Sequence, residues 1–170
     1  AATAFRSTWH AVDQAHTSRT GVGPGFRSEG TVSASSNLAD TVLSGLPRVR
    51  DWQEGFYRDL HKHPELSHQE SETARKVADR LRGCGFEVHN GIGGTGVIGV
   101  LDNGSGPGVL LHADMDALPV EEATGLDYAS TARATDADGN EVPVMHACGH
   151  DGHTATLLAA LGAAAVALVL

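Results

Sequence analysis

Residues 145–153 read Met-His-Ala-Cys-Gly-His-Asp-Gly-His, and an almost wholly apolar stretch follows them from Thr154 onward. Imidazole, thiolate and carboxylate are the three kinds of side chain that bind zinc. Cys148 and His150 are separated by one glycine, so an extended backbone would direct both side chains to the same side. A polar loop with a buried cysteine is the plainer interpretation. The density of ligand types directly before an apolar helix favours a metal site.

The apolar stretch after this cluster predicts a helix that packs closely inside an α/β domain, because it is rich in alanine and glycine. It is shorter than the roughly 18–20 apolar residues that cross a bilayer, so no membrane association is expected.

The composition supports a globular α/β chain: 170 residues, 41% of them hydrophobic, with few aromatic side chains. The net charge of −9 argues against nucleic acid or an anionic membrane surface as a partner. Residues 112–151 hold nine Asp or Glu and one Arg, which suits a solvated face or cation binding. Two cysteines make no disulfide scaffold, so a reduced, cytoplasmic location is predicted.

Residues 1–44 are rich in Ser, Thr, Gly and Ala and show no sustained period, which predicts a flexible N-terminal extension. Three arginines in this segment also fit an organellar transit peptide. Residues 45–170 are expected to form the folded domain.

Two helices are expected first. Apolar residues recur at three- and four-residue steps over 46–61, and Ser67 with Glu70 matches a capping box that would open a second helix, ending near Gly83. His61, His63 and His68 surround the turn between these helices. No shared spacing unites them, so they are interpreted as surface and cap residues.

Strands are expected at 86–89, 96–101 and 108–114, with a hairpin turn at Asn103-Gly104 between the last two. Residues 91–96 fit G-x-G-x-x-G, but a strand-like sequence follows instead of a helix, so they predict a turn and not a dinucleotide site. Residues 136–140 predict an exposed hairpin or loop.

A second candidate site follows the most apolar of these strands. His112, Asp114 and Asp116 alternate, so a continued strand would direct all three side chains one way. Polar groups at the end of a buried strand lie where open α/β sheets bind ligands. Aspartates in a turn or at a helix cap are the alternative.

Three segments in this order resemble the N-acyl-amino-acid amidohydrolases, which include hippurate and auxin-conjugate hydrolases, in the aminoacylase–carboxypeptidase group of dinuclear metallopeptidases. The segments are His61-x-x-Pro-Glu-Leu-Ser67, residues 114–121 and residues 145–154. The resemblance implies a three-layer α/β/α catalytic domain, of which this chain holds an N-terminal portion, without the lid domain or the C-terminal half.

By position, the resemblance implies that Cys148 and His150 are metal ligands and that Asp114 orients and polarises a ligand. Arg is usual at position 112 in this branch, so His112 is either a neutral replacement or an additional ligand. Two divalent metals are implied in a complete site, zinc or manganese, with cobalt or nickel also compatible. The family's general-base Glu and its remaining ligands have no counterpart in this chain.

The implied activity is hydrolysis of the amide bond of small-molecule N-acyl amino acids by a metal-activated water, in a protein that could form a homodimer at full length. Two alternatives stay open. The chain could be a truncated, inactive fragment, or a metal-binding or regulatory module that uses only Cys148 and His150.

Overall fold

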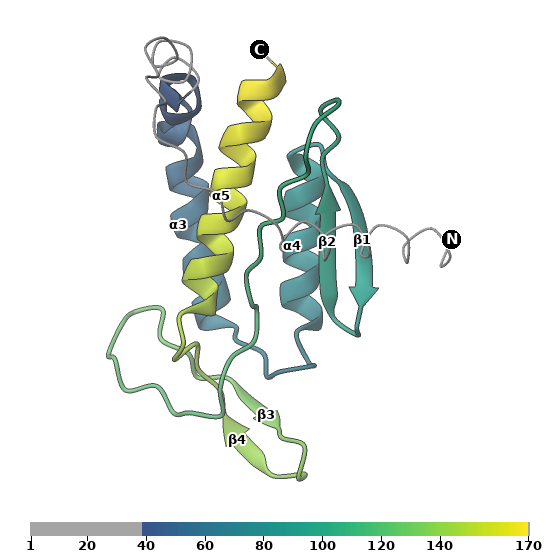
Figure 1. Cartoon of the computed structure of the whole chain (residues 1–170). Helices are drawn as coiled ribbons and strands as arrows, with labels where there is room; N and C mark the ends of the chain where they lie inside the picture. The colour runs from purple at the N-terminus through teal and green to yellow at the C-terminus, as the bar shows by residue number, and fades with distance from the viewer. Residues whose placement is uncertain (1–38, 170) are drawn as a thin grey trace, which may run out of the picture. The chain divides into compact units, whose positions relative to one another are not determined.

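The computed structural model describes residues 39–169, which lie in one of the chain's two compact units, Ala34–Leu170. Its elements, shown in Figure 1, are α3 (Leu46–Lys62), α4 (Ser71–Gly83), β1 (Glu87–Ile92), β2 (Gly96–Val100), β3 (Arg133–Thr135), β4 (Glu141–Pro143) and α5 (His150–Val169). Residues 39–44, inside the predicted flexible extension, are helical. The rest of that extension lies outside the described residues.

The two long helices α3 and α5 lie side by side (Figure 1) and have the most extensive contact of any two elements. Both were predicted from the sequence. Pro47 is tolerated in the first turn of α3 because that turn has no partner for its N–H groups. Pro64 follows the helix end, where it disfavours a helical conformation of the residue before it. Between residues 39 and 169, the structure contains no helix with the length and apolar character that a membrane crossing requires.

Helix α4 packs against the hairpin of β1 and β2, which pair antiparallel. The glycine-rich residues 91–96 form the turn between these strands, so the prediction of a turn is confirmed. Val77, Leu81 and Leu158 are buried here and join α4 to α5. At Gly99, a Cβ atom would lie 3.1 Å from the Leu81 side chain, so the absence of a side chain allows the helix and hairpin to pack closely.

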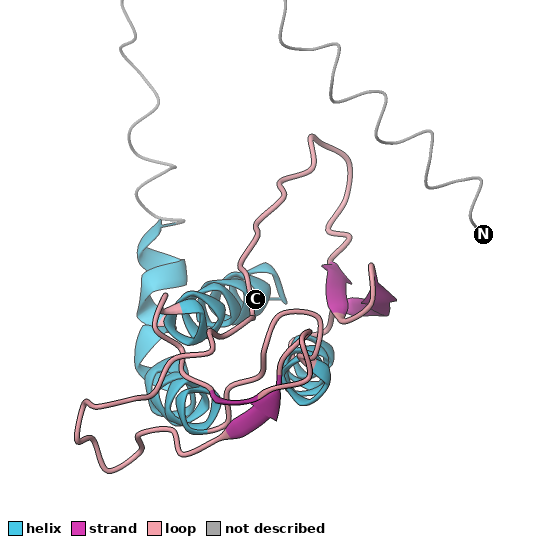
Figure 2. Cartoon of the chain, turned by 90° about the horizontal axis from the view of Figure 1, so that it is seen from below, coloured by secondary structure: helices cyan, strands magenta, loops and turns pink. Residues whose placement is uncertain are grey.

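The predicted strand at residues 108–114 is absent, and so is the predicted hairpin at Asn103-Gly104. Val109 and Leu110 are 84% and 81% exposed. A strand requires partners for its backbone N–H and C=O groups, and no strand of residues 39–169 pairs with this segment. Figures 1 and 2 show two separate two-stranded sheets. The described residues are therefore mixed α/β, and they do not form three layers.

The predicted capping box is also wrong, because α4 begins at Ser71 and Ser67 lies outside it. Glu65 acts in its place: its carboxylate accepts hydrogen bonds from the backbone N–H groups of Glu72 at 3.1 Å and Thr73 at 2.7 Å. His68 has a φ of 64°, which reverses the chain before the helix. Glu70 accepts instead from the Thr95 hydroxyl at 2.5 Å.

The second hairpin, β3 and β4, turns at residues 136–140 as predicted, where Asp136 accepts from the backbone N–H of Asn140 at 2.8 Å. Near it, Leu66 forms a bridge to Ala117, and Leu118 forms a bridge to Met145. These bridges bring the segment after residue 114 beside the segment that precedes α5. They therefore position both candidate sites that the sequence predicts, residues 112–116 and 145–153.

Candidate metal centre

Cys148, Gly149 and His150 form the corner between the Leu118–Met145 bridge and α5. Gly149 has a φ of 78°, a conformation that disfavours any side chain, so the sharp entry into the helix depends on this glycine. Cys148 is a free, exposed thiol at the corner, and His150 is the first residue of α5. The corner presents a sulfur donor to solvent next to an imidazole.

His150 is held in one orientation by Asp116. Its Nδ1 atom lies 2.9 Å from both the backbone carbonyl oxygen and the Oδ1 atom of Asp116. A carbonyl oxygen can only accept, so Nδ1 carries a proton, and in the neutral ring the lone pair is on Nε2. Within residues 39–169 no hydrogen bond occupies Nε2. Metal-binding histidines commonly donate their other N–H to a carboxylate or backbone carbonyl, so this arrangement fits a metal ligand.

The structure does not bring His112 and Asp114 into the same arrangement. Their side chains are exposed, and they lie 3.7 Å from each other, Nε2 to Oδ1. The backbone carbonyl of Asp114 accepts a hydrogen bond from the Thr154 hydroxyl at 3.0 Å. Asp114 thus contacts α5 through its backbone alone, whereas Asp116 contacts it through both its backbone carbonyl and its side chain.

The described residues contain no group of three or more His, Cys, Asp or Glu side chains arranged to hold a metal ion. Catalytic zinc usually has three protein ligands. A thiolate and an imidazole with a free Nε2 fit zinc or a related divalent ion by their chemistry. By themselves, Cys148 and His150 would supply only a part of such a site.

A second polar cluster lies beside this corner and is buried. His61, in the last turn of α3, is placed between two carboxylates: its Nδ1 lies 2.6 Å from Asp151 Oδ2 and its Nε2 lies 3.0 Å from Glu122 Oε1. The three side chains are 7%, 2% and 0% exposed, in the order His61, Asp151 and Glu122. We call these three residues the His61 network.

Hydrogen bonding in the His61 network favours the charged forms of His61 and Glu122. Burial by itself would lower the pKa of His61, but the hydrogen bonds to Glu122 and Asp151 outweigh burial and raise the pKa. Burial would raise the pKa of Glu122, but hydrogen bonds from the Thr124 hydroxyl, the Ser130 N–H and His61 lower it. An imidazole can donate to a carboxylate on each side only when both ring nitrogens carry protons, and the raised pKa favours this imidazolium form.

His146 is buried between these two groups of residues. Burial, as the largest effect, lowers its pKa, so the ring is neutral. Neither ring nitrogen has a hydrogen-bond partner among the described residues. A buried polar atom without a partner is costly, so His146 marks this part of the structure as able to take another polar group.

The interpretation of His61 as a surface residue is wrong, because Tyr57 and Tyr128 cover its ring at centroid distances of 5.7 and 5.4 Å. His63 is exposed and pairs with Asp59, as a surface residue would. The sequence analysis also missed Glu122 and Asp151 as partners. The acid-rich segment 112–151 contains both carboxylates, but nothing in the sequence pairs them with His61.

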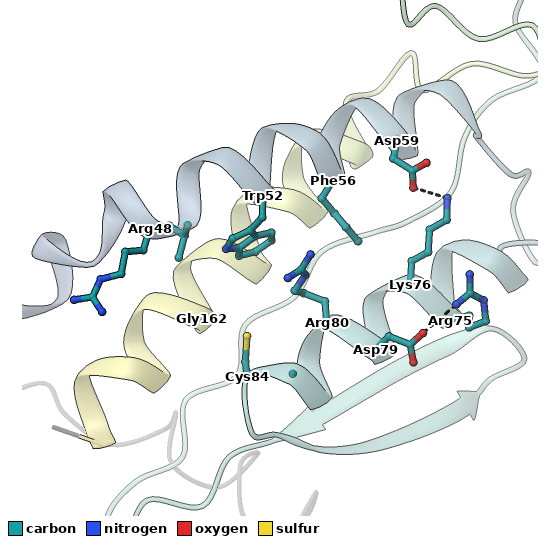
Figure 3. Close-up of a pocket in the computed structure, with 12 residues that line it drawn as sticks. Arg48, Trp52, Phe56, Asp59, Arg75, Lys76, Asp79, Arg80, Cys84 and Gly162 are labelled. Atoms are coloured by element: carbon teal, nitrogen blue, oxygen red, sulfur yellow. Dashed lines mark hydrogen bonds and ion pairs between the residues drawn. The ribbon is translucent and has the colours of Figure 1, made fainter.

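A separate pocket between α3, α4 and α5 is lined by Trp52, Phe56 and several charged residues (Figure 3). The Arg80 guanidinium lies over the Trp52 ring at 4.2 Å, and Lys76 pairs with Asp59 at 2.6 Å. None of the residues 145–153 lines this pocket. It is therefore distinct from the candidate metal centre.

Comparison with known proteins includes the residues of the candidate metal centre. Residues 110–168 match peptidase family M20/M25/M40. Thermostable carboxypeptidase 1 of Saccharolobus solfataricus is 43% identical over 125 residues, which are 72% of this chain and 29% of that protein. The hippurate hydrolase of Campylobacter jejuni is 45% identical over 119 residues, which are 68% of this chain and 29% of that protein.

A crystal structure of a Bacillus subtilis protein, described as a dinuclear metal binding peptidase from the M20 family, is similar in fold. It is 38% identical, with a TM-score of 0.56, over 66% of this chain and 29% of that one. This chain thus spans less than a third of the length of the proteins it matches. Over the region that it shares with them, the chain belongs to peptidase family M20/M25/M40.

Proposed function

We propose that Cys148 and His150 bind a divalent metal in an enzyme that hydrolyses the amide bond of N-acyl amino acids. The observation that carries this proposal is the hydrogen bonding of His150: Nδ1 is engaged by Asp116, Nε2 has no hydrogen bond within the described residues, and Cys148, two residues earlier, has an exposed thiol. The likeness to a hippurate hydrolase supports the substrate class, since hippurate is an N-acyl amino acid. The likeness to a dinuclear metal binding peptidase supports a two-metal site.

The chain's own residues have separate roles in this proposal. Cys148 and His150 supply the sulfur and nitrogen ligands, which favour zinc, while manganese, cobalt and nickel are compatible. Asp116 orients His150. Asp114 is proposed to orient a ligand, and His112 is an additional ligand candidate; both depend on a rearrangement of their exposed segment. When bound, the metals would supply an acidified water and polarise the amide carbonyl.

The exposed segment 108–114 supports a further part of the proposal. A run as apolar as Val109, Leu110 and Leu111 is normally buried on both faces in a parallel sheet. We propose that it is a strand of the central sheet of a three-layer catalytic domain, whose remaining strands and ligands, and the lid domain, belong to the part of the relatives that this chain does not span. Formation of that strand would redirect His112 and Asp114.

The test is hydrolysis of N-acetyl and N-benzoyl amino acids by the full-length protein that carries this sequence, with added zinc or manganese. We expect Cys148→Ala to lower both metal content and hydrolysis and to leave the far-ultraviolet circular dichroism unchanged. Cys84→Ala is the matched control, because Cys84 is the chain's other free thiol and lies outside the candidate metal centre. A Cys148→Ala enzyme with normal metal content and activity would rule the role out.

A second candidate is a catalytically inactive fragment or a metal-binding module. It is favoured by the two-ligand donor set and by the 29% of the relatives' length that the chain spans. An assay of the 170-residue chain distinguishes this candidate from the enzyme. If the chain hydrolyses N-acyl amino acids when supplied with zinc or manganese, it is neither an inactive fragment nor a module that only binds metal.

A further inference from the structure

The His61 network joins three segments that are distant in the sequence. Asp151 directly follows His150, and both of its carboxylate oxygens are engaged: Oδ2 lies 2.6 Å from His61 Nδ1, and Oδ1 accepts from the Gly152 N–H at 2.8 Å. The side chain cannot turn without losing one of these bonds. The first turn of α5, which begins with His150, is thereby fixed to the last turn of α3.

The other carboxylate of the network fixes the segment that leads to the corner. Glu122 accepts a hydrogen bond from the Ser130 N–H at 2.5 Å and one from the Thr124 hydroxyl. The Ser130 hydroxyl donates to the Val144 carbonyl oxygen at 2.7 Å. Residues 144–151 are therefore held at Val144 through Glu122 and at Asp151 through His61, while Cys148 between them stays exposed.

We propose that the His61 network is a positioning device, and that its three residues set the mutual geometry of Cys148 and His150. This inference rests on the proposed role of these two residues as metal ligands. A buried ion pair adds little net stability compared with well-packed apolar side chains. Three buried, hydrogen-bonded side chains that hold both ends of one short segment are better explained by a requirement for fixed orientation. Outer partners of this kind typically change metal affinity about 10–100-fold.

The test is a titration of the 170-residue chain with Co²⁺, which replaces zinc and gives a charge-transfer absorption when a thiolate binds it. The wild-type chain should show this absorption. We expect His61→Gln to weaken Co²⁺ binding about 10–100-fold and to alter the absorption, because Gln cannot bridge the two carboxylates. A role limited to stability would leave the absorption unchanged in the folded protein.

His63→Gln is the matched control, since His63 lies just beyond the same helix end but is exposed and paired with Asp59. It should bind Co²⁺ as the wild type does. If His61→Gln does not fold by circular dichroism, Glu122→Gln, which keeps the size of the side chain, takes its place with the same expected result.

Each result decides the proposal. A folded His61→Gln or Glu122→Gln chain with wild-type affinity and absorption overturns the positioning role and leaves the metal-ligand proposal intact. If both variants unfold, the network stabilises the fold and the positioning proposal is wrong. If the wild-type chain shows no thiolate absorption with Co²⁺, the ligand role of Cys148 fails first, and the inference fails with it.

Discussion

The His61 network and the Cys148 corner lie at the same end of α5 but differ in burial and in hydrogen bonding. The His61 network is buried, and each of its polar groups has a partner. At the corner, the Cys148 thiol is exposed and His150 Nε2 has no hydrogen bond within the described residues. A buried charge must be paired to be tolerated, whereas a metal ligand must keep a lone pair free. The first region should therefore contribute most to the stability of the metal-free chain, and the second should supply the metal ligands.

The largest effect is expected from Asp151→Ala. This change leaves the His61 imidazolium buried with one carboxylate, and removal of one partner of a buried ion pair costs about 3–5 kcal/mol. Urea unfolding of the metal-free chain measures this loss as a lower midpoint with an unchanged slope. Asp79→Ala is the control, because Asp79 pairs with Arg75 and Arg82 on the surface and should cost at most about 1 kcal/mol. Equal losses in Asp151→Ala and Asp79→Ala would contradict the difference between the buried His61 network and a surface ion pair.

A smaller loss is expected from Ser130→Ala, which removes the connection between the Glu122 loop and Val144. The Ser130 hydroxyl donates to Val144 and accepts from the Ala132 N–H at 3.1 Å. Leaving a buried carbonyl and N–H without partners costs about 1–3 kcal/mol. Thermal unfolding gives the measurement.

Ser67→Ala is the comparison for Ser130→Ala, because Ser67 is exposed and lies outside helix α4. Its unfolding free energy should change by less than about 0.5 kcal/mol. A loss of about 1 kcal/mol at Ser67 would instead be the signature of a helix cap.

The local elements could be predicted from the sequence because local rules determine them. The apolar periodicity gave α3, the glycine-rich turn gave the β1–β2 hairpin, and the chemistry of residues 145–153 pointed to the corner before α5. The strand at 108–114 could not be confirmed in the same way. Its apolar run has the composition of a buried strand, but pairing depends on neighbours that the sequence pattern does not supply.

The His61 network shows a second limit of prediction from the sequence. His61, Glu122 and Asp151 are up to 90 residues apart in the chain, and no short spacing connects them. His61 and His63 look equivalent beside Pro64, yet one is buried and the other exposed. The difference comes from the packing of α3 on α5, which directs His61 toward Asp151. Nothing local to the motif specifies that contact.

The dependence of the unfolding free energy on pH tests the charge of the His61 network. This charge accounts for part of the network's contribution to stability. The pKa of His61 is raised above its ordinary 6.5, so its stabilising effect is complete below that pH and is lost as the pH rises through the folded value. The pKa of Glu122 is lowered from 4.5, so its effect is complete above that pH and is lost as the pH falls through the folded value. The network should stabilise most between these two values.

The measurement is the unfolding free energy of the metal-free wild type minus that of His61→Gln, followed across pH. Asp151, Tyr57 and Tyr128 also face His61, and both burial and the charge of Asp151 raise the pKa of Tyr57, so this tyrosine stays neutral in the window. The difference should be largest between pH 4.5 and 6.5 and should decrease on both sides. A difference that does not decrease as the pH rises above 6.5 would mean that the charged form of His61 does not contribute to it.

Cys148→Ala is expected to have the smallest effect on stability and the greatest effect on metal binding. Cys148→Ala removes an exposed thiol and no packing, so the metal-free chain should change by less than about 0.5 kcal/mol. Zinc at a free concentration 100 times its dissociation constant would stabilise the wild-type chain by about 2.7 kcal/mol, because it binds the folded state. Thermal unfolding of the wild-type and Cys148→Ala chains should therefore differ only when zinc is present.

The Asp79→Ala chain should keep the full stabilisation by zinc. A Cys148→Ala chain that is stabilised as much as the wild type would show that the thiol at the corner is not the ligand, and that the buried His61 network does not serve the metal through Cys148.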